Sequence, residues 1–280
     1  MKFLAVDTSS LVGTVVAMEW EPNSKAKFND VRLVAEWTLN IESSHHSEKL
    51  LWAIHQVLEA AGWELSELSF MGVGVGPGSF TGLRIGLTTI KTLAKVLSKP
   101  VVGVSSLAVL SRPASIYLNE YNQNTLMIAA TDACKGEYYC LSGLAKEVKE
   151  CVVSGESGKN FKNGLWKRGV IEKVLKTEEM IDHVLSRLNK NKKLNWCVVS
   201  KQHSKNIWSE LPKRRQVVLP VPFLDLISGK YLGMLVWEGF QAGLSKDASE
   251  ILPRYLRESD AEIKLKAGLL PSAPTRGGNV

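Results

Sequence analysis

Residues 68–75 read Leu-Ser-Phe-Met-Gly-Val-Gly-Val, and residues 76–86 continue as Gly-Pro-Gly-Ser-Phe-Thr-Gly-Leu-Arg-Ile-Gly. The first part is an apolar run, which is typical of a buried strand. Apolar residues then recur at helical spacing from Leu83 to Leu97, and Pro100 ends the pattern. A buried strand that runs through a glycine-rich turn into a helix predicts an α/β fold.

The segments before this stretch predict three strands and one helix. Residues 2–6 are apolar and end at Asp7, a polar turn follows at 8–10, and residues 11–20 are again rich in β-formers. Residues 31–40 predict the third strand. Residues 50–61 carry apolar side chains at helical spacing, with a serine at 43 or 44 as a cap and Gly62 at the end.

The opening pattern recurs in the second half of the chain. Residues 125–131 are apolar and end at Asp132, a tight turn follows, and residues 137–144 are aromatic and β-like. Asp7 and Asp132 lie 125 positions apart. The recurrence indicates two lobes of common architecture, although two unrelated hairpins would give the same pattern. We expect an N-terminal lobe at 1–110, a C-terminal lobe at 111–258 and a loose C-terminal tail at 259–280.

Other segments give simpler patterns. Residues 100–104, 194–199 and 216–219 predict strands. Residues 106–110, 178–188 and 223–242 predict helices.

The chain has a net charge of +7, and much of it lies in two runs of basic residues. Such runs are usually a solvated surface, and the alternative is weak attraction to RNA or to an acidic partner. The four cysteines form no C-x-x-C pair, and no apolar run approaches the roughly 20 residues that span a bilayer. We therefore expect a cytoplasmic protein with no membrane partner. The two runs are Lys190, Lys192 and Lys193, then Lys213, Arg214 and Arg215.

Two turns are candidates for binding an anion or a nucleotide. At the start of a helix, exposed amides and the helix dipole can hold an anion, and Arg84 is a cation close to the glycine-rich turn. The turn matches no known phosphate code, so a tight structural turn is an equal alternative. The polar turn after the first strand could hold a metal-bound phosphate or be a plain hairpin turn. The candidate contact residues are Asp7, Thr8, Ser9, Gly76, Gly78, Ser79, Thr81 and Arg84.

Gly82 and Gly86 lie four positions apart and share one face of the predicted helix. Each costs helix stability, roughly 1 kcal/mol relative to alanine. We expect the close approach of a neighbouring helix to offset this cost. The helix at 50–61, from this chain or from a partner, is the expected neighbour.

Metal and nucleophilic chemistry find little support in the sequence. Neither H-x-x-x-H nor H-E-x-x-H occurs, and His45 and His46 are typical of polar residues at a helix start. Cys134 and Cys140 have no histidine near them in sequence, and Ser79 lies outside a G-x-S-x-G elbow. We expect no metal site and no catalytic residue.

The stretch 76–86 resembles the signature of the TsaB (YeaZ) family. Residues 4–9, 46–51, 102–107, 132–139 and 253–257 resemble the family's opening turn, first helix start, next strand, second-lobe hairpin and C-terminal signature. The resemblance is strong over about the first 140 residues. It departs at Cys134, where the family usually carries arginine, which leaves the role of that position open.

The resemblance implies an actin-like ATPase fold with two ribonuclease-H-like lobes of mixed sheets flanked by helices. It implies a non-catalytic subunit that pairs with a TsaD-like enzyme, which forms N6-threonylcarbamoyladenosine at position 37 of tRNAs reading A-starting codons. A TsaE-like ATPase would join them, tRNA would bind through the complex, and isolated chains would form homodimers. No cofactor of its own is expected, with ATP or ADP at the interface with partner subunits as the one exception.

The same resemblance implies that two N-terminal helices, at 46–61 and 81–97, supply half of a four-helix bundle with the partner. The expected interface residues are His46, Leu50, Leu51, Ile54, Leu58, Gly82, Leu83, Gly86, Leu87 and Ile90. The main alternative is an ATP-dependent kinase or ATPase of the same fold that uses Asp7 and the glycine-rich turn. A metallopeptidase and a stand-alone RNA-binding protein are further alternatives.

Overall fold

The computed structural model describes residues 1–22, 31–40, 46–121, 124–148, 170–199, 208, 210–217, 227–257 and 264–265. The first sheet has the order β3-β2-β1-β4-β5. β1 (Lys2–Asp7) is antiparallel to β2 (Val12–Trp20) and parallel to β4 (Leu68–Gly74), with β3 (Val31–Asn40) and β5 (Val101–Val104) at the edges. The predicted strands of this half are thereby confirmed.

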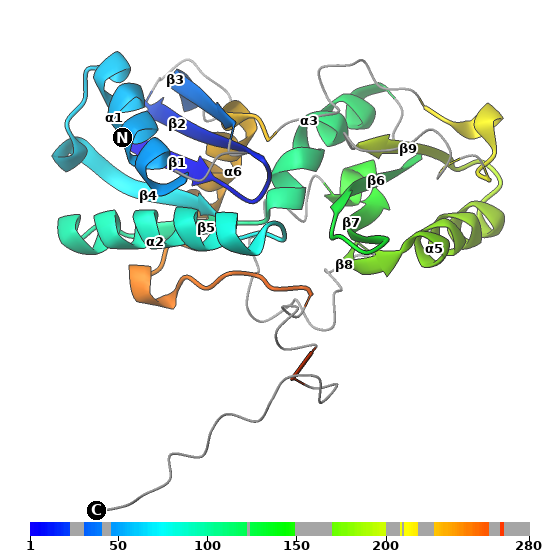
Figure 1. The fold of residues 1–280 in the computed structure, drawn as a ribbon. Coiled ribbons are helices and arrows are strands. Elements are labelled where there is room, and N and C mark those ends of the chain that lie inside the picture. Colours follow the sequence, from blue (N-terminus) through cyan, green and yellow to red (C-terminus); the bar gives the residue numbers. More distant parts are fainter. Residues whose placement is uncertain are drawn as a thin grey trace, which may run out of the picture.

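Both faces of the central strands of the first sheet are buried, whereas most side chains of the edge strand β3 are exposed or half-buried. Side chains alternate along β1, so that Phe3 and Ala5 join one core cluster while Leu4 and Val6 join another. Helices α1 (His46–Ala61) and α2 (Phe80–Leu97) cover the second of these faces, and α6 (Gly229–Gln241) covers the first (Figure 1). This double cover explains why the strands read as continuous apolar runs.

The second sheet repeats the order of the first. β6 (Thr125–Asp132) takes the place of β1, with antiparallel β7 (Glu137–Leu144), then β8 (Ile171–Lys176), and parallel β9 (Asn195–Val199) on its other side. Helix α5 (Thr177–Lys190) packs on this sheet as α1 packs on the first. The two aspartates match as well, because the Asp7 carboxylate accepts the Ser9 amide and the Asp132 carboxylate accepts the Cys134 amide. The predicted repeat and the two-lobed α/β fold class are confirmed.

Two helices lie between the lobes and change the expected division of the chain. Helix α3 (Ser106–Tyr121) runs beyond the predicted end at residue 110, continues through Pro113 and contacts the second sheet. Helix α6 was expected in the C-terminal lobe, yet it returns to pack on the first sheet. It begins at Gly229, and residues 223–226 of the predicted helix lie outside the described part. The strand predicted at 216–219 is a single bridge between Gln216 and Trp196 where it is described.

The segment at 251–257, which we call the strap, joins the two lobes. On the first lobe, the Arg254 amide donates to the Val75 carbonyl, and the Tyr255 ring packs against Phe80. On the second lobe, the Arg254 side chain pairs with the fully buried Glu172 at 3.0 Å, and Arg257 pairs with Glu137 at 2.9 Å. Ser105, just before α3, also donates its hydroxyl to Glu172 at 2.7 Å. Glu172 thus ties the strap, α3 and β8 together.

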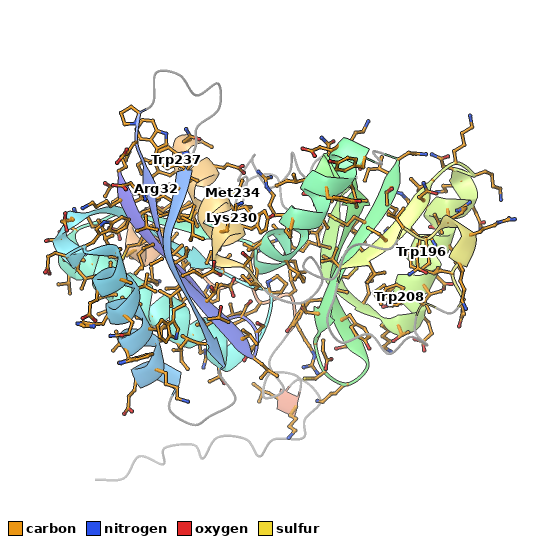
Figure 2. The ribbon with its side chains drawn as sticks, turned by 90° about the horizontal axis from the view of Figure 1, so that it is seen from above. Arg32, Trp196, Trp208, Lys230, Met234 and Trp237 are labelled. Carbon is orange, nitrogen blue, oxygen red and sulfur yellow. The ribbon has the colours of Figure 1, made fainter. Side chains whose placement is uncertain are left out.

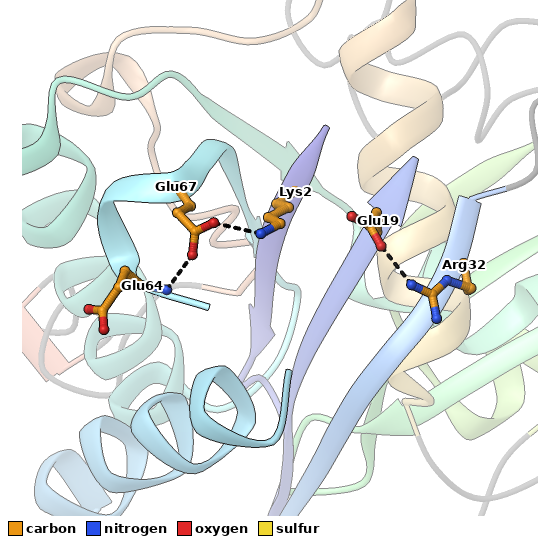
Figure 3. A network of polar contacts seen from close by, with 5 residues as sticks. All are labelled: Lys2, Glu19, Arg32, Glu64 and Glu67. Carbon is orange, nitrogen blue, oxygen red and sulfur yellow. Dashed lines mark hydrogen bonds and ion pairs between the residues drawn. The ribbon is translucent and has the colours of Figure 1, made fainter. Parts of the chain in front are cut away.

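The strap pair predicts an asymmetry between two arginine substitutions. Arg254→Ala leaves the Glu172 carboxylate buried without its cation, which should cost about 3–5 kcal/mol of unfolding free energy. Arg32→Ala removes the solvent-exposed partner of Glu19 and should cost no more than about 1 kcal/mol (Figure 3). Urea unfolding of both variants measures the difference. Equal losses would show that the Glu172 pair does not hold the lobes together.

Candidate functional site

The turn after β1 is closed around the Asp7 carboxylate. This carboxylate accepts the amide of Ser9 at 2.8 Å, the hydroxyl of Ser9 at 2.6 Å and the hydroxyl of Ser106 at 2.6 Å. Burial raises the pKa of Asp7 above its ordinary value, and the three hydrogen bonds oppose that rise. Asp7, Thr8 and Ser9 are all buried. The polar atoms of this turn are therefore already hydrogen-bonded within the chain.

The glycine-rich turn packs directly on the Asp7 turn. A side chain at Gly78 would place its Cβ 2.2 Å from the Ser9 carbonyl oxygen, and the Ser79 amide donates to that same oxygen at 2.7 Å. The Ser79 hydroxyl accepts the Gly82 amide at the start of α2. Of the expected anion contacts, Ser79, Thr81 and Arg84 reach the surface, whereas Gly76 is buried with a φ of +95°. The geometry favours the tight structural turn over an open anion cradle.

Arg84 also has a structural environment. Its guanidinium lies 3.9 Å from the centre of the Phe80 ring, and its Nε donates to the Tyr255 hydroxyl at 3.3 Å. These contacts connect the first turn of α2 to the strap. Arg84 therefore has a structural role of its own at the start of α2.

The explanation expected for Gly82 and Gly86 is wrong. A Cβ on Gly82 would lie 2.1 Å from the Thr8 carbonyl oxygen, and a Cβ on Gly86 would lie 2.2 Å from the Thr8 hydroxyl oxygen. Thr8 in turn donates its hydroxyl to the Gly82 carbonyl at 2.7 Å. The glycines bring α2 against the turn after β1 of the same chain, and no partner helix is needed to account for them.

Most of the expected interface residues face inward. Leu50, Ile54 and Leu58 on α1, and Leu83, Leu87 and Ile90 on α2, are buried in the core cluster that covers the first sheet. Apolar spacing along a helix identifies its most apolar face, and here that face packs on the strands. The surface expected on these residues is therefore sealed inside the monomer. The side chain of His46 lies outside the described residues.

The outward side of the same two helices carries apolar side chains that the sequence analysis missed, apart from Leu51. Leu51 is 53% exposed, Trp52 is 51% exposed and Val96 is 76% exposed. Trp52 meets Trp37 of β3 edge to face, with ring centres 5.0 Å apart. These four residues and Leu93 make up what we call the outer face. The available signal was the run of two apolar residues, Leu51 and Trp52, next to the buried stripe.

A groove of about 530 Å³ lies beside the outer face. Its walls come from α1, from α2 through Leu93, and from the segment after α1 that includes the short helix η1 (Leu65–Glu67). Leu51 lines it on one side and Trp63 on another, while His55 and Glu59 add polar edges. Close to it, Glu67 accepts the Lys2 side chain at 2.6 Å and the Glu64 amide at 2.7 Å, which fixes η1 (Figure 3).

The described part of the chain bears on two chemistries that the sequence supports little, metal binding and a nucleophilic cysteine. No group of three or more histidine, cysteine, aspartate or glutamate side chains is arranged to hold a metal ion among those residues. Burial raises the pKa of the Cys140 thiol to about 12, and it raises the pKa of the Cys197 thiol as well. No helix of the described residues is long and apolar enough to cross a membrane.

Comparison with known proteins identifies the family. The family model for TsaD, tRNA N6-adenosine threonylcarbamoyltransferase, matches residues 40–265. The Escherichia coli K12 tRNA threonylcarbamoyladenosine biosynthesis protein TsaB is 27% identical over 265 residues, which is 95% of this chain and 98% of the relative. The chain belongs to the TsaB (YeaZ) branch of the TsaD family. The Bacillus subtilis TsaB protein is 32% identical over 139 residues, 50% of this chain and 53% of the relative.

The enzyme branch of the family and a solved structure also match. A tRNA N6-adenosine threonylcarbamoyltransferase of Methylorubrum populi is 34% identical over 116 residues, 38% of this chain and 33% of the enzyme. The YeaZ structure from Pseudomonas aeruginosa superimposes with a TM-score of 0.58 at 24% identity, covering 91% of this chain and 99% of that one. The TsaB-family chain therefore has the two-lobed actin-like fold that the resemblance implied.

The contact between α2 and Thr8 predicts a specific rescue. Gly86→Ala and Gly82→Ala should each lower the free energy of unfolding by about 1–3 kcal/mol, because the added methyl group overlaps Thr8. Adding Thr8→Ala removes the hydroxyl that Gly86→Ala meets, but it leaves the carbonyl that Gly82→Ala meets. Chemical denaturation should therefore show rescue of the first variant and none of the second. Equal behaviour of the two double variants would contradict the assigned contacts.

Proposed function

We propose that this TsaB-family chain is a non-catalytic subunit in the formation of N6-threonylcarbamoyladenosine at position 37 of tRNAs reading A-starting codons. It pairs with a TsaD-like enzyme, which performs the chemical step. The names of its relatives support the pathway. The exposed apolar outer face of α1 and α2 carries the pairing part of the proposal.

The outer face has the properties of a partner contact. Leu51, Trp52 and Val96 are each exposed by half or more on neighbouring helices, and Leu51 also lines an open groove. Burying a large aliphatic side chain contributes roughly 1.5–3 kcal/mol, and tryptophan is a frequent anchor at interfaces. The partner would cover the outward side of the two helices, while their buried sides stay in the monomer core.

The proposed assembly has further members besides the TsaD-like partner. Homodimers form through the outer face when the chain is alone, so the homodimer and the TsaD-like partner compete for it. A TsaE-like ATPase joins the pair, and tRNA binds to the complex. If ATP or ADP takes part, we expect it where subunits meet, because the polar atoms of the Asp7 turn are already hydrogen-bonded within the chain and its Ser9 carbonyl accepts the Ser79 amide.

Pairing should depend on Leu51. Leu51→Glu places a charge in the apolar contact and should weaken binding of the TsaD-like protein at least tenfold, with an unchanged melting temperature because the side chain is exposed. Leu11→Glu is the matched control, since Leu11 is 55% exposed in the turn between β1 and β2 and should leave affinity unchanged. Titration calorimetry with the TsaD-like protein of the same organism measures both.

A modification assay completes that test. With the TsaD-like enzyme and its other components present, tRNA modification should require the wild-type chain and fall with Leu51→Glu. Raising the concentration of the variant should restore it, because the defect is one of affinity. Modification that proceeds equally without the chain would refute the proposed function. If Leu51→Glu binds the TsaD-like protein with unchanged affinity, the assignment of the outer face as the contact is refuted, while the proposed function itself is not.

The main alternative is an ATP-dependent enzyme that uses Asp7. Asp7 is 1% exposed, and its carboxylate already accepts three hydrogen bonds. A metal-bound phosphate would therefore have to displace Ser9 and Ser106. We expect calorimetry of the isolated chain with Mg-ATP to show no binding at millimolar nucleotide. Micromolar binding accompanied by turnover, and lost in Asp7→Asn, would establish the alternative.

A further inference from the structure

The two basic runs of the sequence meet at one end of the second lobe. Helix α5 ends at Lys190, and the short helix η3 (Lys213–Arg215) lies against that end. Arg215 donates from Nη2 to the Leu188 carbonyl at 3.0 Å and from Nη1 to the Lys192 carbonyl at 3.3 Å. The Trp196 indole donates to the Pro212 carbonyl at 3.1 Å, which holds the segment before η3 against β9. Residues more than twenty positions apart thus form a single basic surface.

The cations of this surface fall into two groups. Arg215 satisfies carbonyls at the C-terminal end of α5, and Lys190 lies where a cation complements the helix dipole, so both have structural roles. Lys192, Lys193, Lys213 and Arg214 are exposed. In the part of the chain that the structure describes, none of these four pairs with a carboxylate. We call these four residues the basic end.

Among the acidic side chains that the structure describes in this lobe, none forms an ion pair with the basic end. Glu178 and Glu179 lie in the first turn of α5, at the opposite end of that helix. Between 187 and 217, Glu210 is the one acidic residue among those described. Because the whole chain has a net charge of +7, four unneutralised cations in one place concentrate much of its excess charge. Such a concentration attracts a polyanion over the range of the Debye length.

The apolar residues around the basic end decide between two kinds of polyanion. A protein partner needs exposed aromatic or aliphatic anchors at the centre of its contact. Here both tryptophans face inward: Trp196 is fully buried and Trp208 is 8% exposed, and both lie within the second lobe (Figure 2). Among the described residues of 170–217, no large hydrophobic side chain is exposed. Tyr121, at the end of α3, is 72% exposed, and Asn124 just after it donates to the Lys193 carbonyl at 2.6 Å. One aromatic ring can stack on a base as well as anchor a protein, and no cluster of apolar anchors accompanies it among these described residues. A phosphate backbone needs cations alone, so the surface fits a nucleic acid better than an acidic protein.

The basic end lies on the second lobe, away from the outer face where the proposed protein partner binds. The outer face lies on α1, α2 and β3 of the first lobe, and α5 lies at the far side of the second (Figure 1). A partner bound to the outer face would leave the basic end open. We propose that the basic end binds the phosphate backbone of RNA. This identification of the RNA rests on the proposed function: the RNA is the tRNA that the complex modifies. The chain then contributes its own contact to that tRNA.

The test measures binding of an unmodified tRNA transcript to the isolated full chain by fluorescence anisotropy between 50 and 200 mM salt. The variant Lys192→Gln/Lys193→Gln/Lys213→Gln/Arg214→Gln removes the basic end. The control Lys95→Gln/Lys146→Gln/Lys230→Gln/Lys246→Gln removes four exposed lysines elsewhere and gives the same net charge. We expect the first variant to bind about tenfold more weakly or worse, and to lose about three units of the salt slope, since each phosphate contact contributes about 0.7–0.9. The control should keep most of both.

The other outcomes have defined meanings. Equal losses in the two variants would show that net charge alone attracts RNA, and the proposal would fail. Polyglutamate that binds the wild-type chain as tightly as tRNA at equal charge would favour an acidic protein and also overturn it. A duplex DNA of similar length tests whether the contact reads RNA shape or phosphate charge, and weaker binding to DNA supports the RNA assignment. Weaker binding to tRNA than to DNA would refute that assignment.

The result is separable from the proposed function. The anisotropy experiment needs no partner and no enzyme activity, so it can succeed even when the modification assay shows no dependence on the chain. Conversely, the variant of the basic end retains the outer face and should bind the TsaD-like protein with unchanged affinity. A loss of both affinities would indicate misfolding, which circular dichroism and the melting temperature of the variant would reveal.

Discussion

Helix α2 can lie against the first sheet only because two of its residues have no side chain. The carbonyl and hydroxyl oxygens of Thr8 occupy the positions where Cβ atoms at Gly82 and Gly86 would be. Beside this contact the Ser79 amide donates to the Ser9 carbonyl, so the turns after β1 and β4 close on each other. Ser106, which follows β5, adds a third element by donating its hydroxyl to Asp7. The loss of helix propensity at two glycines is therefore offset by backbone contact and hydrogen bonding within the monomer.

That closure determines which sides of α1 and α2 remain available. Their most apolar stripes are used by the core, and the weaker apolar stripe beside Trp52 is left outside. The strap then connects the start of α2 to the second lobe through Tyr255 and Arg254. A partner that covers the outer face would thus contact α2, and the first turn of α2 is connected through the strap to Glu172 of the second lobe.

The two lobes share a topology but differ in their surfaces. The first lobe presents exposed apolar side chains on its helices, and the second presents exposed cations around the end of α5. Apolar burial depends on shape and acts at contact, whereas the attraction of cations for phosphates acts over a longer range and weakens with salt. The proposed protein partner and the proposed RNA therefore have separate places to bind on this chain.

The amino-acid sequence by itself predicted most of the strands and helices, the repeat with its aspartates and the family, because periodicity and short motifs are local. It missed β8 and ended α3 too early. It misassigned the glycine pair and most of the interface residues, since apolar spacing marks the face of a helix that will be buried without saying what covers it. Only the tertiary structure placed Thr8 beside Gly86, Arg254 beside Glu172, and Arg215 against the Lys192 carbonyl. Those contacts join residues far apart in the chain, and they depend on how layers pack.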